Sequence, residues 1–220
     1  MSEDKRLEIF YVRHGDTSGA GCGDRSRCDV DLTPLGLEQA RLLGERYSGV
    51  HFDAILCSPL VRAVRTAAAV AERADGHPPI EIVPALIENN TMPDYPGVDL
   101  EYLKRYYPDF TLCTDRIYGD ENGAFANDTD ELNDERAAAV VSYIKKRFSY
   151  GQKVLVVAHG SFGNHFVAAS VGIGEGDYIF SINNTSVTKI KYTPDGKQRI
   201  SFMNDVTHLR GIMPDFDFTV

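Results

Sequence analysis

The chain has 220 residues, of which 43% are hydrophobic and 25% are charged. These values are typical of a soluble globular protein, and the length suits one large domain with a sizeable core. The net charge of −9 argues against nucleic acid and against an acidic membrane surface as partners. A small anionic substrate stays compatible with it, because a few arginines can dominate the charge of a cleft.

The first residues, MSEDKRLEIFYVRH, lack the apolar core and small-residue site of a signal peptide. No apolar run approaches the roughly 18 residues of a membrane span. We therefore expect a cytoplasmic protein without a membrane partner, and reduced, unpaired thiols at its four cysteines. Cys22 and Cys28 flank a polar loop, but no CxxC spacing supports a metal or redox role for them. Nothing in the sequence indicates an oligomeric state.

Leu7–Val12 is a short apolar run interrupted only by Glu8, typical of a strand that is covered on both faces. The polar, glycine-rich segment 16–31 predicts a loop long enough to be functional. Thr33-Pro34 predicts the start of a helix, with threonine as the N-cap and proline at the first position. The apolar side of this helix comprises Leu35, Leu42, Leu43 and Tyr47.

Phe52–Cys57 predicts a second buried strand, and Ser58-Pro59 predicts the cap of the helix that follows it. Ile80–Val83 predicts a third, short strand. From residue 85 to residue 128 the pattern loosens, and Pro, Asn, Gly and Tyr become frequent. We expect this segment to be an inserted cap over the sheet, with Leu100–Tyr107 as its clearest helix.

Asp128 or Thr129 begins a long helix, and Lys153–Ala158 then has the pattern of a buried strand. His159-Gly160 follows that strand directly and leads into another helix. The helical spacing of the long helix rests on Leu132, Val140, Val141, Ile144 and Phe148.

Ser186–Tyr192 and Arg199–Met203 alternate apolar and polar residues and are joined by Thr193-Pro194-Asp195-Gly196. The proline and the glycine suit a type I turn, so this pair predicts a hairpin at the edge of the sheet. The alternation of strands and helices predicts an α/β fold, a three-layer α/β/α sandwich with a mostly parallel central sheet. We expect one domain over residues 1–220, with the cap inserted at about 85–128.

Five side chains that can handle a phosphate group follow the predicted parallel strands. In open α/β sheets, ligands bind beyond the carboxyl ends of the strands. Arginine offers a planar fork for phosphate oxygens, and a neutral imidazole is a competent nucleophile toward phosphorus. These side chains are Arg13 and His14 after the first strand, Arg62 after the second, Glu88 after the third and His159 after the fourth.

Residues near these five side chains supply further groups for the predicted site, and two of the five have alternatives nearby. The helix start at Ser58–Arg62 would add oriented N–H groups for an anion. Gly15 and Gly160 would let the backbone and a phosphate approach closely. Arg65 is an alternative to Arg62, since it lies on the same predicted helix. The alternatives to Glu88 as an acid are Asp94 and Asp99.

Five sequence blocks, in order, resemble the histidine phosphatase superfamily in its phosphoglycerate mutase-like branch. The resemblance covers nearly the whole chain. The blocks are RHGDT (Arg13–Thr17), LTPLGLEQA (Leu32–Ala40), SPLVRAVRTA (Ser58–Ala67), LIE (Leu86–Glu88) and VVAHG (Val156–Gly160).

The resemblance implies a role for each candidate residue. His14 would be the nucleophile that becomes phosphohistidine. Arg13, Arg62 and His159 would hold the phosphoryl oxygens. Glu88 would protonate the leaving alkoxide and then activate water. The resemblance implies no metal ion and no other cofactor, and it implies a small phosphorylated substrate as the partner.

The chain departs from the family pattern at the positions where its mutases carry tryptophan. It contains no tryptophan; Ser18-Gly19-Ala20 and Tyr95-Pro96-Gly97 stand there instead. We therefore predict a metal-independent phosphatase. A phosphoglycerate mutase that uses 2,3-bisphosphoglycerate and a non-catalytic relative that binds a phosphorylated ligand remain the alternatives. Arg25 and Arg27 are candidate substrate-selecting charges, although a solvated loop is an equal interpretation.

Overall fold

The computed structural model describes residues 6–18, 29–89, 99–119, 129–174 and 180–213. Within these residues one seven-stranded sheet has the order β4-β3-β2-β5-β1-β6-β7. The first five strands of that order run parallel, and β6 and β7 run antiparallel at one edge. The strands are β1 (Leu7–Arg13), β2 (Ala54–Cys57), β3 (Ile80–Ile82), β4 (Phe110–Leu112), β5 (Lys153–Ala158), β6 (Val187–Tyr192) and β7 (Gln198–Asp205).

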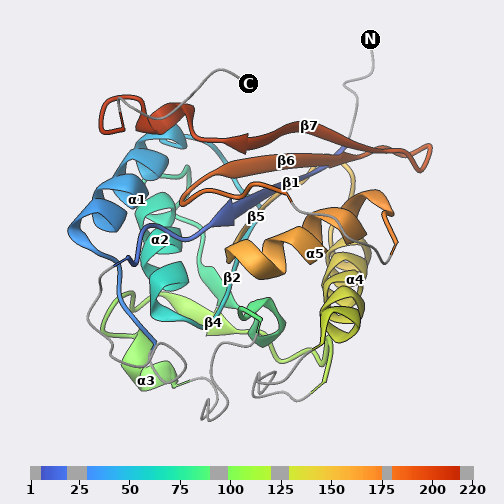
Figure 1. The fold of residues 1–220 in the computed structure, drawn as a ribbon, viewed down its shortest axis with the longest axis horizontal. Coiled ribbons are helices and arrows are strands. Elements are labelled where there is room, and N and C mark those ends of the chain that lie inside the picture. Colours follow the sequence, from blue (N-terminus) through green and yellow to red (C-terminus); the bar gives the residue numbers. More distant parts are fainter. Residues whose placement is uncertain (1–5, 19–28, 90–98, 120–128, 175–179, 214–220) are drawn as a thin grey trace.

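Helices cover the sheet on both sides, α1 and α2 on one side and α4 and α5 on the other (Figure 1). Successive side chains of β1 point to opposite faces, as the pleat of a strand requires. Phe10 and Val12 pack with α2, and Ile9 and Tyr11 pack with α4 and α5. The predicted three-layer sandwich with a mostly parallel sheet is confirmed. The helices are α1 (Pro34–Arg46), α2 (Val61–Ala71), α3 (Leu100–Leu103), α4 (Asp130–Arg147) and α5 (Gly160–Val171), with 3-10 turns at Pro84–Leu86 and Thr207–Leu209.

Three predicted starts and turns are confirmed, each through a specific hydrogen bond. The Thr33 side chain accepts from the N–H of Gly36 at 3.1 Å and caps α1. Thr129 caps α4 in the same way. The hairpin turn is closed by the Gly196 N–H, which donates to the Thr193 carbonyl oxygen at 2.9 Å. Gly196 has a φ of 81°, a conformation that glycine adopts without a steric penalty.

Four predictions about the elements are wrong in detail. The helix after the second strand begins at Val61, so Ser58-Pro59 does not cap it. The predicted helix Leu100–Tyr107 is α-helical only over its first turn, α3, and Tyr107 is buried in the cluster that contains α2. Leu35 of α1 and Leu132 of α4 were expected on the packed faces of their helices, but they are 44% and 40% exposed.

The segment predicted as a cap also contributes β4, which sequence analysis missed. This three-residue strand pairs in parallel with β3 at the sheet edge. Two of its three residues are exposed, so it lacks the apolar run by which the other parallel strands were recognised. None of the helices in the described part of the chain is long and apolar enough to cross a membrane.

Candidate active site

The two histidines meet because their strands are neighbours in the sheet. In the parallel pair of β1 and β5, Arg13 lies opposite Ala158, so His14 and His159 leave the sheet side by side. Their ring centroids are 5.1 Å apart, close to the spacing between neighbouring strands. Both rings are buried, with 5% and 0% of each residue exposed. The site therefore forms at the carboxyl edge of the sheet, as predicted.

The backbone determines which nitrogen of His14 carries the proton. Its Nδ1 lies 2.7 Å from the carbonyl oxygen of Gly15, which can only accept, so Nδ1 donates. The neutral ring then has its lone pair on Nε2. Burial, followed by the charge of Arg62, holds the pKa of His14 well below its usual value. His14 is thus a neutral imidazole at neutral pH, and none of the described residues binds its Nε2 lone pair.

Backbone contacts on both sides fix the loop that carries His14. The N–H of His14 donates to the Ala158 carbonyl oxygen at 3.0 Å. The N–H of Gly15 donates to Thr66 Oγ1 at 3.0 Å. A Cβ on Gly15 would lie 2.6 Å from the carbonyl oxygen of Gly36, so this glycine is required by the packing of the loop against α1. That it also lets a phosphate approach the backbone stays a prediction from the sequence.

A strained residue after α5 supports the same loop from the other side. Thr185 has a φ of 52°, which is uncommon for a β-branched residue. Its N–H donates to the carbonyl oxygen of Arg13 at 3.0 Å. The side-chain amide of Asn184 donates to the carbonyl oxygen of His14, also at 3.0 Å. His208 Nε2 lies 3.1 Å from Thr185 Oγ1 and holds the strained residue in place.

His159 is held by a hydroxyl group and presents a second nitrogen without a partner. Its Nε2 lies 2.7 Å from Ser58 Oγ, at the end of β2. Its Nδ1 is buried and has no hydrogen-bond partner among the described residues. Burial and then the charge of Arg62 lower the pKa of His159 well below its usual value. A buried polar atom left unpaired in this way is suited to an incoming ligand.

Arg13 is anchored through one nitrogen and leaves another buried nitrogen free. Its Nη1 donates to the carbonyl oxygen of Ile182 at 2.7 Å. Its Nε is buried and, within the described part of the chain, unpaired. A Cβ on Gly160 would lie 3.1 Å from this Nε, so Gly160 leaves room for the guanidinium beside His159. The predicted close approach of a phosphate to Gly160 stays a prediction from the sequence.

Arg62, and not its alternative Arg65, belongs to the site. The side chain of Arg62 is 8% exposed, and its charge acts on both buried imidazoles. Arg65 instead pairs with Asp31 at 3.2 Å and lies over the ring of Tyr106. The two arginines that the sequence singled out therefore flank the two histidines.

Asp29 occupies the helix end that we expected an anion to use. The N–H of Val61, the first residue of α2, donates to its two carboxylate oxygens at 2.9 and 3.0 Å. The carboxylate also lies 3.9 Å from Arg62 Nη1. Burial raises the pKa of Asp29 to about 6, against the opposing effects of the Val61 N–H and Arg62. The expected anion site at this helix N-terminus is therefore already filled by the chain itself.

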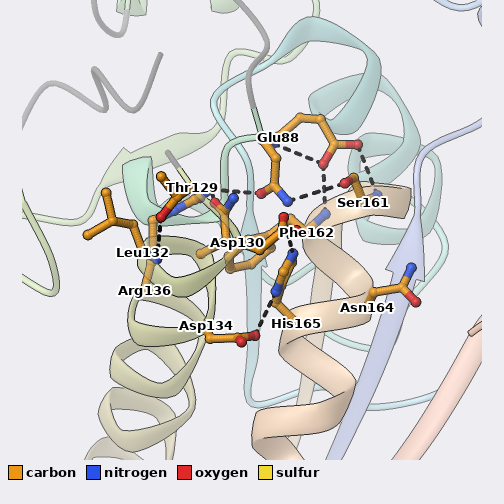
Figure 2. A network of polar contacts seen from close by, with 12 residues as sticks. Glu88, Thr129, Asp130, Leu132, Asp134, Arg136, Ser161, Phe162, Asn164 and His165 are labelled. Atoms are coloured by element: carbon orange, nitrogen blue, oxygen red, sulfur yellow. Dashed lines mark hydrogen bonds and ion pairs between the residues drawn. The ribbon is translucent and has the colours of Figure 1, made fainter. Parts of the chain in front are cut away.

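Glu88 lies across the site at the start of α5. Its Oε1 accepts from the N–H groups of Phe162 at 2.8 Å and Asn89 at 3.0 Å. Its Oε2 accepts only one of the described N–H groups, that of Ser161, at 3.2 Å. Asp99, an alternative acid, instead caps α3 through the N–H of Tyr102. Figure 2 shows the Glu88 carboxylate facing the first turn of α5.

The structure thus brings Arg13, His14, Arg62 and His159 together, with Glu88 acting electrostatically on Arg62. The contacts of Ser58 and Asp29 were not predicted from the sequence. Ser58 stood in a recognised block, so its position at the end of a strand was a usable signal, whereas Asp29 gave none. Several residues considered in the sequence lie outside the described residues; they are Cys22, Cys28, Arg25, Arg27 and Asp94. Cys57 and Cys113 are buried free thiols.

Comparison with known proteins identifies the family. The signature of the histidine phosphatase superfamily, branch 1, matches residues 9–206. The chain belongs to this superfamily. It is 30% identical to the uncharacterized phosphatase PhoE of Bacillus subtilis, over 93% of this chain and 98% of that protein. It is 27% identical to a broad-specificity phosphatase of Saccharomyces cerevisiae, over 88% of this chain and 83% of that one.

Solved structures agree on the fold. The phosphoglycerate mutase of Bacillus anthracis superposes with a TM-score of 0.65, over 94% of this chain and 96% of that one. The two sequences are 21% identical, so this likeness establishes the shared fold and leaves the reaction open. The resemblance to the histidine phosphatase superfamily is therefore confirmed at the level of family and fold.

Proposed function

We propose that this protein is a metal-independent phosphatase that hydrolyses a small phosphomonoester through a phosphohistidine at His14. One observation carries the proposal. A neutral, buried imidazole has its Nε2 lone pair free, beside a second imidazole and within the field of two arginines. This arrangement suits attack on a dianionic phosphoryl group. Family membership and the phosphatase names of the relatives support it.

In the first step, His14 Nε2 would form a bond to phosphorus while the bond from phosphorus to the ester oxygen breaks. Glu88, in its protonated form, would give its proton to the departing oxygen. Arg13, Arg62 and the Nδ1 atom of His159 would hold the phosphoryl oxygens. In the second step, a water molecule would attack phosphorus, Glu88 would accept its proton, and the bond to Nε2 would break. Phosphate and free His14 result.

The first test is the activity of His14→Asn, which keeps a polar side chain of lower reactivity. We expect hydrolysis of 4-nitrophenyl phosphate to fall at least about a thousandfold while the folded signal in circular dichroism is retained. Hydrolysis by the unmodified protein should continue in EDTA, in keeping with a site built from imidazoles, guanidinium groups and a carboxylate. Full activity in the variant, or complete inhibition by EDTA, would contradict the mechanism.

The product of the reaction distinguishes a phosphoglycerate mutase from the proposed phosphatase. With 3-phosphoglycerate and 2,3-bisphosphoglycerate supplied together, a mutase forms the isomeric monophosphate, whereas a phosphatase releases inorganic phosphate. We expect phosphate. The inserted cap at about 85–128, like a cytoplasmic location, stays a prediction from the sequence.

A further inference from the structure

Arg136 is a buried cation that the proposed mechanism does not use. It lies on α4 and is the largest fully buried side chain of the described residues, with 0% exposed. Burial of a charged group carries a large desolvation cost unless hydrogen bonds replace the lost water. The hydrogen-bond acceptors of its N–H groups therefore indicate the role of a buried cation at this position.

The partners of Arg136 bracket Glu88 in the sequence. Its Nη1 donates to the carbonyl oxygens of Ala85 at 3.0 Å and Ile87 at 2.8 Å. Its Nη2 donates to Asn89 Oδ1 at 2.9 Å. Ile87 and Asn89 are the residues immediately before and after Glu88, so one guanidinium holds both sides of this residue. Figure 2 shows Arg136 reaching from α4 toward the loop that carries Glu88.

The same guanidinium also fixes the partner that orients the carboxylate. The guanidinium carbon lies over the ring of Phe162, a residue of the first turn of α5, at 4.4 Å from the ring centroid. The N–H of Phe162 is the donor to Glu88 Oε1 at 2.8 Å. Asn133, one turn before Arg136 on α4, accepts from Nη2 at 2.7 Å and keeps the plane of the guanidinium from turning. Arg136 thus ties three elements together at Glu88.

We propose that Arg136 is a positioning residue for Glu88, which it acts on through the clamped loop without contacting the substrate. This inference rests on the proposed role of Glu88 as the proton donor. The clamp needs the planar fork of arginine, because two carbonyl oxygens and two amide oxygens are bound in different directions. A lysine retains the charge but presents one nitrogen with three donors, so it cannot reproduce the four bonds that leave the two separate nitrogens of Arg136.

The dependence of the rate on the leaving group separates this role from a merely structural one. A proton donor contributes about 10²–10⁴-fold, and it matters most when the departing oxygen is strongly basic. 4-Nitrophenyl phosphate has a weakly basic leaving group, and phenyl phosphate has a more basic one. A displaced Glu88 should therefore impair phenyl phosphate more than 4-nitrophenyl phosphate. A general loss of folded protein should impair both substrates equally.

The experiment measures kcat/KM for a series of substituted phenyl phosphates with Glu88→Gln, Arg136→Lys and the double variant. We expect Glu88→Gln to lower the rate on phenyl phosphate by about a hundredfold and on 4-nitrophenyl phosphate by less than about tenfold. Arg136→Lys should show the same selectivity at roughly tenfold. In the double variant the Arg136 change should add little, because both changes act through one group.

Further variants serve as controls and as a replacement for Arg136→Lys. Tyr192→Phe removes a buried 2.9 Å hydrogen bond to the Ser170 carbonyl oxygen, away from Glu88, and should leave the leaving-group dependence unchanged. Asn89→Ala leaves the buried charge in place and removes two bonds, the one from Arg136 Nη2 and a 3.2 Å bond from Asn89 Nδ2 to Ser161 Oγ. It replaces Arg136→Lys if that variant does not fold, and Ser161→Ala, which removes only the second bond, is its matched control. Asn89→Ala should show the same selectivity to a smaller degree.

The outcomes separate the inference from the proposed function. If Glu88→Gln leaves the dependence unchanged, the proposed role of Glu88 is wrong, and the inference about Arg136 is wrong with it. If Glu88→Gln changes the dependence but the folded clamp variants lower all rates equally, as a stability defect would, the inference alone is overturned. A selective loss shared by Glu88→Gln and the clamp variants supports both.

Discussion

At the scale of single residues, the chemistry of the site depends on which ring nitrogen of His14 and of His159 carries the proton. The Gly15 carbonyl oxygen places the His14 proton on Nδ1 and leaves Nε2 to react. His159 remains neutral because burial and Arg62 lower its pKa. To donate from Nδ1 to a phosphoryl oxygen, the neutral ring must accept a hydrogen bond at Nε2. Ser58 Oγ, 2.7 Å away, can supply that bond.

We predict that Ser58→Ala lowers kcat/KM roughly ten- to a hundredfold, because His159 then loses the partner that keeps its proton on Nδ1. Nitrogen-15 NMR of the imidazole should find the proton on Nδ1 in the native protein and a mixture of tautomers in the variant. A native ring protonated on Nε2, or an unchanged kcat/KM, would count against this assignment.

At the scale of elements, sequence patterns predicted the buried layers well. Short, mainly apolar runs identified β1, β2, β3 and β5, because parallel strands covered on both faces carry few polar residues. Local chemistry identified the start of α1, since threonine followed by proline satisfies the first N–H groups of a helix. The order of the strands, which brings β1 beside β5 and so joins the two histidines, is a tertiary property that no local pattern contains.

Two of the failed predictions about elements share one physical cause. β4 and the start of α2 are determined by partners far along the chain. β4 is a short, exposed strand that exists through its pairing with β3. The first N–H of α2 is bound by Asp29, 32 residues earlier, so no capping side chain beside the helix was needed. Contacts of this range leave no periodic trace in the sequence.

The site itself was predictable in its residues but not in its supports. Arg13, His14, Arg62 and His159 were recognisable because each stands at the end of a strand or in the first turn of a helix. The clamp on Glu88 by Arg136 joins residues about 50 positions apart. An arginine in the middle of a long helix has the pattern of a solvated face, and only the packing of α4 on α5 reveals that it is buried.

At the scale of the whole molecule, buried histidines connect the site to stability in acid. Burial, followed by the charge of Arg46, lowers the pKa of His208 to about 4, whereas the unfolded chain has the ordinary value near 6.5. The pKa values of His14 and His159 are lowered in the same direction. Between pH 6.5 and the folded values, the unfolded state binds more protons, so stability falls as the pH falls. The raised pKa of Asp29 acts in the opposite direction.

We therefore predict that His208→Gln flattens the pH dependence of stability. The free energy of unfolding should fall between pH 7.5 and pH 5 by less in the variant than in the native protein, the difference being on the order of 1–2 kcal/mol. Urea denaturation at the two pH values measures it, and Asp29 cancels because both proteins contain it. An equal fall in both proteins would show that His208 does not titrate on unfolding in this range.

The most direct measurement on the central claim is to trap the phosphoryl group on the enzyme. The protein is mixed with 4-nitrophenyl phosphate, quenched with alkali within the first turnovers and digested, and the peptides are analysed by mass spectrometry. We predict a phosphoryl group on His14, stable to alkali and labile to acid, and none in His14→Asn. Turnover that leaves His14 unmodified, or that modifies another residue, would contradict the account.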